Sequence, residues 1–162
     1  MNKSAENIFS LLKEISDPEI PVINIVEMGI VQKVDFIDEE IIISITPTYS
    51  GCPAMKMIEE HIKEILLHNN ISNFNIKTSY SPAWTTDWLS NETKKKLENY
   101  GISAPGKTED INEMKVLSMQ KIHCPYCNST DTKLTSEFGS TACKSLHYCN
   151  ECSQPFEHFK CI

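Results

Sequence analysis

Two cysteine pairs with metal-binding spacing lie in the last quarter of the chain, Cys-Pro-Tyr-Cys at 124–127 and Cys-Asn-Glu-Cys at 149–152. Each pair can form a tight knuckle, and four thiolates complete a tetrahedral zinc site. The intervening residues 128–148 exceed the usual spacing slightly, which a longer hairpin accommodates. We therefore predict a structural zinc bound by four residues: Cys124, Cys127, Cys149 and Cys152. A rubredoxin-like iron site uses the same ligands and is the main alternative.

A fifth cysteine, Cys52, lies between a β-rich run at 41–45 and a helical pattern that starts near Met55. Pro53 suits the first helical position, which places Cys52 at the N-cap. A thiol there faces free backbone N–H groups and the positive end of the helix dipole. That geometry can lower the pKa of a cysteine and favour the thiolate, which binds metals or attacks electrophiles. The alternative is a small buried residue at a strand-to-helix corner.

Three other groups of residues have a simpler expected role. The stretch Asp-Pro-Glu-Ile-Pro at 17–21 predicts a stiff turn with two carboxylates close together. Trp84 and Trp88 are four residues apart, on one face if they lie in a helix, and we expect them to pack as core; a patch for docking a partner is the alternative. Cys143 and Cys161 are expected to be structural, Cys161 being either packed or exposed.

The periodicities that must position these groups predict an α+β fold. Its first part is a small mixed sheet with helices on one face, and its second is a β-rich zinc ribbon. The expected domains are 1–102, a polar linker at 103–120, and the ribbon at 121–162. The expected helices cover residues 4–16, 53–68 and 91–100, and the expected strands cover residues 30–36, 40–46, 74–80, 132–138 and 141–148. The ribbon is too small to rely on a core, so metal binding should supply much of its folding energy.

Composition narrows the class of protein. The 162 residues carry a net charge of −7, and all 15 basic residues are lysine, which disfavours nucleic-acid binding because arginine is preferred for phosphate and base recognition. No apolar run approaches a membrane span, and the N-terminus lacks the regions of a signal peptide. We therefore expect a cytoplasmic protein whose seven cysteines stay reduced and serve metal or thiol chemistry rather than disulfides.

The motifs at 17–22, 25–31 and 46–53 together resemble the SufT-like domain of iron–sulfur cluster assembly proteins. The stretches 81–90 and 138–144 and the terminal ribbon look more specifically like the PaaD family, the accessory D components encoded with phenylacetyl-CoA epoxidase. The resemblance implies a non-catalytic factor that assembles or maintains the metal centres of the epoxidase's oxygenase and reductase. It implies that Cys52 handles an iron–sulfur cluster or iron, with Asp17, Glu19 and Thr48 lining the same region.

One thiol per chain limits what Cys52 can do alone, because an iron–sulfur cluster usually has four cysteine ligands. Transient, shared ligation is therefore expected, across a homodimer, with an epoxidase component or other iron–sulfur client, or with a small thiol. Two functions of other classes stay open. One is a zinc-ribbon module that binds protein; the other is a thiol enzyme with Cys52 as nucleophile, although no histidine lies near Cys52 in sequence.

Overall fold

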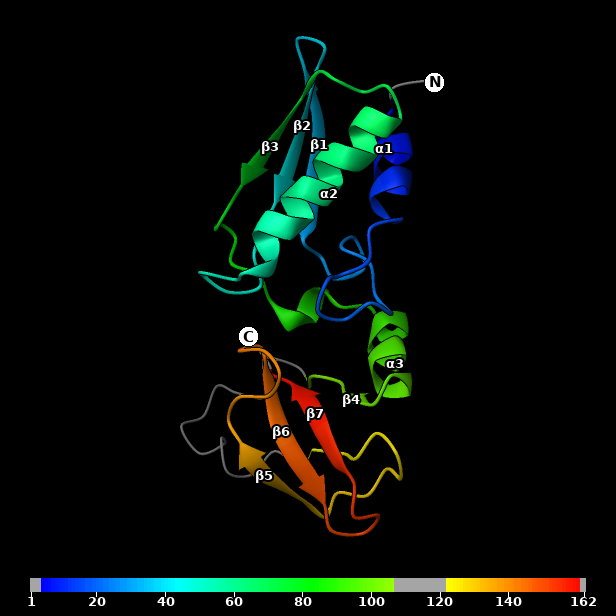
Figure 1. The fold of residues 1–162 in the computed structure, drawn as a ribbon, viewed down its shortest axis with the longest axis vertical. Coiled ribbons are helices and arrows are strands. Elements are labelled where there is room, and N and C mark those ends of the chain that lie inside the picture. The colour runs from blue at the N-terminus through cyan, green and yellow to red at the C-terminus, as the bar shows by residue number, and fades with distance from the viewer. Residues whose placement is uncertain (1–3, 107–121, 161–162) are drawn as a thin grey trace. The chain divides into compact units, whose positions relative to one another are not determined.

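The structure, a computed structural model, describes residues 4–106 and 122–160, which form two compact units that divide between Trp84 and Thr85 (Figure 1). The division comes earlier than the expected domain boundary at residue 102. Residues 85–106 therefore fold together with the ribbon. Most of the expected linker, residues 107–120, lies outside the described residues, as does Cys161.

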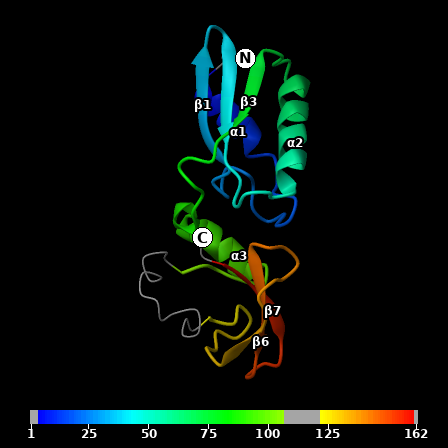
Figure 2. The same cartoon turned by 90° about the vertical axis from the view of Figure 1, so that its left-hand side faces the viewer.

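The first unit is a three-stranded mixed sheet with two helices on one face, as predicted (Figures 1 and 2). Strand β1 pairs antiparallel with β2, and β2 pairs parallel with β3 across the crossover helix α2. The elements in chain order are α1 (Ala5–Leu12), β1 (Val31–Ile37), β2 (Glu40–Ile45), α2 (Ala54–His68) and β3 (Phe74–Thr78).

The core of the first unit forms where α2 covers the sheet. Helix α2 buries one stripe at helical spacing, formed by Ile58, Ile62 and Leu66. The central strand β2 contributes Ile41 and Ile43, which are fully buried. Helix α1 is shorter than predicted because the N–H groups of residues 14 and 15 bond three residues back, which unwinds the helix after Leu12.

Trp84 is part of this core, which confirms the packing interpretation for that residue. Its side chain is 4% exposed, and its indole N–H donates to the carbonyl of Met28 at 2.9 Å. Trp88 is half-buried and belongs to the short 3₁₀ helix η1 (Thr86–Trp88) of the second unit. The two tryptophans therefore do not share a helical face.

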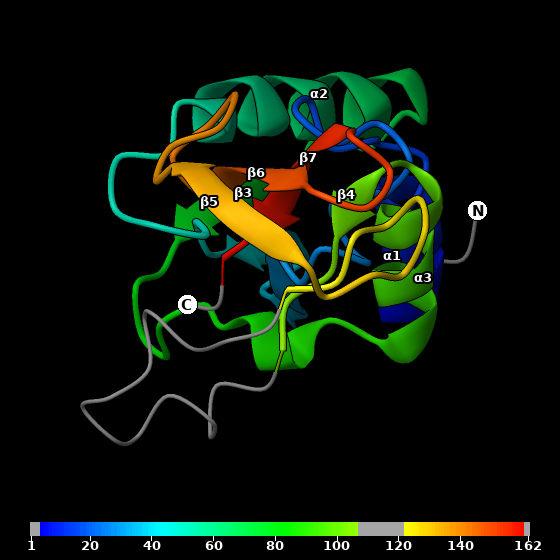
Figure 3. The same cartoon turned by 90° about the horizontal axis from the view of Figure 1, so that it is seen from below.

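The second unit is a four-stranded sheet in the order β4-β7-β6-β5, with α3 preceding it in the chain (Figure 3). The predicted β5–β6 hairpin is confirmed, whereas β4 and β7 were not predicted. Strand β4 has two residues and pairs parallel with β7, so the segment after α3 is part of the ribbon sheet. The elements are α3 (Asn91–Asn99), β4 (Ile102–Ser103), β5 (Thr132–Ser136), β6 (Lys144–Cys149) and β7 (Pro155–Phe159).

Gly101 allows α3 to end in contact with the first cysteine knuckle. It ends the helix with φ +90°, a conformation that glycine adopts without strain. The Tyr126 hydroxyl lies 2.7 Å from where a Cβ of residue 101 would be, so the knuckle's tyrosine fills the space that the missing side chain leaves. In the described part of the chain, no helix is long and apolar enough to cross a membrane.

Candidate functional site

The sheet topology of the first unit brings two distant loops to one end of the sheet. Because β1 is antiparallel to β2, the loop that leads into β1 (residues 13–30) and the loop that leaves β2 (residues 46–53) lie at the same end. The Thr46 N–H fixes them together by donating to the Ile30 carbonyl at 2.8 Å. The four residues that the resemblance implicated, two from each loop, are thereby placed at one site.

Cys52 is the centre of this site, and its sulfur is half-buried rather than sealed in the core. The Ala54 N–H at the start of α2 and the Thr48 hydroxyl donate hydrogen bonds that favour the thiolate, and the carboxylates of Glu19 and Asp17 are close enough to oppose it. The structure thus places the other three predicted residues within electrostatic or hydrogen-bonding reach of Cys52. The N–H groups at the start of the helix could be anticipated from the sequence, but not which residue would supply one.

Two expectations about Cys52 were wrong. The helix begins at Ala54 with Pro53 as its N-cap, one residue later than predicted, because the Cys52 carbonyl accepts from Met55 at 3.4 Å in a tighter three-residue turn. The pKa of Cys52 is raised, not lowered. Burial of the thiol is the largest cause, and the repulsion from Glu19 and Asp17 adds to it, so that the two hydrogen bonds are outweighed.

The raised pKa of Cys52 predicts slow alkylation that increases as the pH rises, because only the thiolate reacts. Glu19→Gln removes a repelling charge, lowers the pKa and should speed alkylation several-fold at pH 8. Thr48→Ala removes a donor to the thiolate and should slow it. The measurement is peptide-resolved mass spectrometry after timed exposure to iodoacetamide, which separates Cys52 from the other cysteines. Equal rates in the wild type and in Glu19→Gln would contradict this electrostatic account.

Asp17 combines a structural with an electrostatic role. Its side chain is 5% exposed, and one carboxylate oxygen accepts from the N–H groups of Glu19 at 2.9 Å and Ile20 at 2.8 Å. The sequence predicted this turn, because an aspartate side chain commonly accepts hydrogen bonds from the backbone N–H groups of the residues that follow it. The turn fixes Glu19, which is half-exposed, on the side of Cys52.

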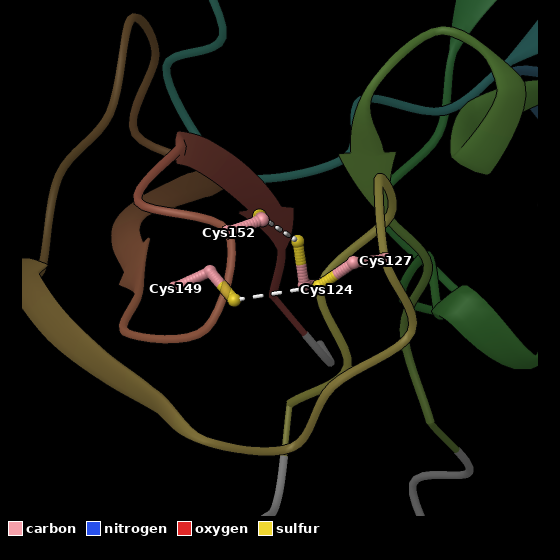
Figure 4. Close-up of side chains that lie close together, drawn as sticks. All are labelled: Cys124, Cys127, Cys149 and Cys152. Carbon is pink, nitrogen blue, oxygen red and sulfur yellow. Dashed lines mark hydrogen bonds between the residues drawn. The ribbon is translucent and has the colours of Figure 1, made fainter.

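The predicted zinc ligands of the second unit come together as one cluster (Figure 4). The four sulfur atoms lie within 4.8 Å of one another; Cys124 and Cys152 are 3.6 Å apart, as are Cys127 and Cys149. A tetrahedral site with Zn–S bonds of ~2.3 Å has sulfurs about 3.8 Å apart. The arrangement therefore fits a metal, and its sulfurs are too far apart for disulfide bonds.

The surroundings of the cluster also fit a bound cation. Backbone N–H groups of Cys152 and Glu151 donate to the Cys149 sulfur and, with the neighbouring thiols, lower the pKa of Cys149 to about 7. Burial among the other three thiols raises the pKa of Cys152 to about 12. Without a cation, four sulfurs this close cannot all be thiolates. In the described ranges, no other three or more histidine, cysteine or acidic side chains bring their ligand atoms this close together, and Cys52 with its two carboxylates does not.

Cys143, the remaining described cysteine, is buried at 4% exposure. Its sulfur lies 3.0 Å from the Thr141 hydroxyl oxygen, in the loop between β5 and β6. This agrees with the structural role expected for it.

Comparison with protein families matches the two units to two different models. Residues 5–68 match an iron–sulfur cluster assembly protein family, and residues 108–160 match the PaaD zinc beta ribbon domain. The first match covers both loops of the Cys52 site, and the second covers all four cysteines of the cluster. The ribbon is therefore a zinc ribbon with a four-cysteine metal site.

Similar proteins of known name fall into two groups by length. The chain is 42% identical over 155 residues, 96% of this chain and 92% of the relative, to the Escherichia coli protein named as the putative D component of 1,2-phenylacetyl-CoA epoxidase. It is 32% identical over 91 residues, 55% of this chain and 88% of the relative, to "Fe-S protein maturation auxiliary factor YitW" of Bacillus subtilis. A crystal structure of a DUF59 domain of unknown function from Bacillus anthracis matches with a TM-score of 0.53 and 25% identity, covering 57% of this chain and 90% of that one.

Proposed function

The chain belongs to the PaaD family, and on that premise we propose that it is a non-catalytic accessory factor of a phenylacetyl-CoA epoxidase. Its role is to assemble or maintain an iron–sulfur cluster or another iron centre of that enzyme. The relative named as a component of the epoxidase and the relative named as an iron–sulfur maturation factor together support this combination. The observation that carries the proposal is the half-buried Cys52 thiol held between two hydrogen-bond donors and two carboxylates.

The electrostatics of the Cys52 site suit a cation as cargo better than an electrophilic substrate. The raised pKa keeps the thiol protonated at rest, which is unfavourable for a nucleophile. An iron ion reverses this, because its positive charge is attracted by Glu19 and Asp17 and displaces the thiol proton to solvent as the Fe–S bond forms. The groups that influence the thiol are acidic or hydroxylic rather than a histidine base, which also disfavours a thiol enzyme.

Shared ligation follows from the number of ligands that the site offers. Cys52 and its carboxylates do not form a closed metal site by the geometry that the four-cysteine cluster satisfies. A cluster or iron bound here needs further ligands from a second molecule, for which the client protein, a second copy of the chain or a small thiol qualify. Such incomplete ligation favours transfer over storage, because the acceptor can complete the coordination.

The ribbon metal has a separate, structural role in this proposal. Four cysteine thiolates in a closed tetrahedron are typical of structural zinc, and no open position is left for a substrate. We propose zinc as the resident metal, with rubredoxin-like iron as the alternative. The two are distinguished by metal analysis, because an iron tetrathiolate is coloured and zinc is not.

Iron loading of anaerobically purified protein tests the proposal. The wild type, incubated with ferrous iron and sulfide, should gain iron-dependent visible absorption, and Cys52→Ser should not. Both should retain about one zinc per chain, because Cys52 is not a ribbon ligand. Cys143→Ser is the matched control, since it removes another thiol outside the cluster and should load like the wild type. Equal loading of Cys52→Ser would overturn the proposed role of Cys52.

A further inference from the structure

We propose that the ribbon carries a docking surface for another protein component of the epoxidase, anchored by Phe138 just after strand β5. The inference deepens the proposed function by assigning client recognition to a part of the chain remote in sequence from Cys52. Because it rests on the proposed function, the experiment below separates a failure of docking from a failure of iron handling.

The comparisons indicate that recognition specific to the epoxidase belongs to the ribbon. The maturation factor of Bacillus subtilis aligns over 91 residues, which is 88% of its length. The unaligned part of that maturation factor is too short to contain a ribbon, because the ribbon match in this chain spans residues 108–160. The relative named as an epoxidase component aligns over both units. The feature that accompanies the epoxidase name is therefore the ribbon, whereas the assembly unit is shared with a general maturation factor.

Within the ribbon, apolar side chains are exposed at one edge of the sheet. Strand β5 is the outer strand, and its outer edge has no strand partner within the ranges that the structure describes. Leu134 in β5 is 53% exposed, and Phe138, just after the strand, is 63% exposed. Single exposed apolar residues are common on protein surfaces, so exposure alone does not identify an interface. The way in which the Phe138 loop is held provides the further argument.

The loop that presents Phe138 is fixed by a partly buried acid. The Glu157 carboxylate accepts from the Ser140 N–H at 2.5 Å and pairs with the buried Lys144 ammonium at 3.1 Å. Gly139 is required for this contact, because a Cβ there would lie 2.6 Å from the Glu157 carboxylate oxygen. These contacts account for Gly139 and Ser140 in the stretch at 138–144, which the Cys52 chemistry does not use.

The Phe138 ring itself is also positioned. The Lys160 ammonium lies 4.7 Å from the ring centroid and donates to the Glu137 carbonyl at 3.1 Å. An exposed aromatic ring held against a neighbouring cation loses less conformational freedom on binding than a free ring does, which favours it as an interface anchor. The structure therefore maintains, in the free protein, a projecting aromatic ring with a cation on its face.

These features specify the partner surface that would fit. Phe138 requires an apolar pocket, and Lys160 favours acidic groups at the rim of that pocket. The whole chain has a net charge of −7 and would repel an acidic partner. The Lys160 ammonium beside Phe138 offsets that repulsion locally. The occupant that we assign is another protein component of the epoxidase, with such a pocket.

The test measures binding of the full-length protein to the remaining purified components of phenylacetyl-CoA epoxidase by biolayer interferometry. Phe138→Ala should weaken the Kd on the order of 30-fold, as truncation of an anchor residue does. Phe36→Ala is the matched control, because Phe36 is a 42% exposed phenylalanine of the other unit and its loss should leave binding unchanged. Zinc content and circular dichroism should match the wild type in both variants, since neither ring is buried.

The outcomes separate the two proposals. Wild-type affinity of Phe138→Ala would overturn the docking surface and leave iron handling by Cys52 intact. A change in self-association of Phe138→Ala, without a change in binding to the epoxidase components, would also overturn it, because the surface would then serve a second copy. Phe138→Ala should still load iron in the absence of client, whereas Cys52→Ser should bind the client normally and fail to load. Full loading by Cys52→Ser would overturn the proposed function instead.

Discussion

Removal of the ribbon metal should unfold the second unit and leave the first unit folded. Cys149→Ser, or incubation of the wild type with a strong chelator, removes a ligand or the metal from the four-sulfur cluster. Structural zinc contributes on the order of 10 kcal/mol to folding in small modules, which is comparable to the whole net stability of a domain. We therefore expect β5, β6 and β7 to lose their amide protection entirely.

The size of this effect follows from what surrounds the metal. The cysteine ligands are themselves the centre of a small apolar cluster, in which Cys124, Cys149 and Phe156 are buried and Ile122 and Cys152 pack against them. Loss of the metal thus leaves buried sulfurs without a partner, and the small cluster around them cannot hold the two cysteine knuckles together by packing alone. The first unit has its own core under α2 and does not depend on these sulfurs.

Hydrogen exchange followed by mass spectrometry measures this outcome by segment. Peptides from β2 and α2 should keep their protection after chelation, and peptides from β6 and β7 should exchange fully. Cys143→Ser is the control, since it removes a buried cysteine of the same unit that is not a ligand. Retained protection of β6 in the chelated protein would show that packing alone sustains the ribbon.

The parts of the fold that could be predicted from the sequence are those that depend on local residue spacing and periodicity. The four ribbon cysteines were found because a metal site constrains their spacing, and the β1–β2 hairpin and helix α2 were found because their periodicity is long and regular. Strand β7 was missed because it begins at a proline, which weakens the strand signal of a run. Strand β4 was missed because two residues carry no periodicity, and its pairing with β7 joins distant segments.

The Cys52 site shows the same limit at the level of chemistry. Spacing alone located a cysteine at a strand-to-helix corner, but it did not connect residue 52 with residues 17 and 19. That connection came from the resemblance and depends on the antiparallel β1–β2 pairing, which places both loops at one end of the sheet. The direction of the pKa shift was also out of reach, because burial and the distance to two carboxylates are properties of the folded chain.

Cys52→Ser should abolish rescue of epoxidase activity in cells that lack the accessory factor, while the wild type restores it fully. A serine hydroxyl keeps the size and the hydrogen bonds of the site but is a far weaker iron ligand than a thiolate, so the fold persists and the transfer is lost. The readout is the iron content and turnover of the epoxidase purified from those cells. Rescue by Cys52→Ser would reduce Cys52 to a structural residue.

Two further variants make this result specific to iron transfer. Glu19→Gln removes a charge that attracts the cation but leaves the sulfur, so it should slow the rescue without abolishing it. Asp17→Asn acts differently, because the same carboxylate also accepts two backbone N–H bonds, and part of its effect will come from loosening of the turn. If the thiol binds iron and the carboxylates only assist, the two variants should differ. Cys52→Ser should lose all rescue, and Glu19→Gln should lose only part of it. An equal and complete loss in both variants would instead indicate that the shape of the loop, rather than the sulfur, is what the client recognises.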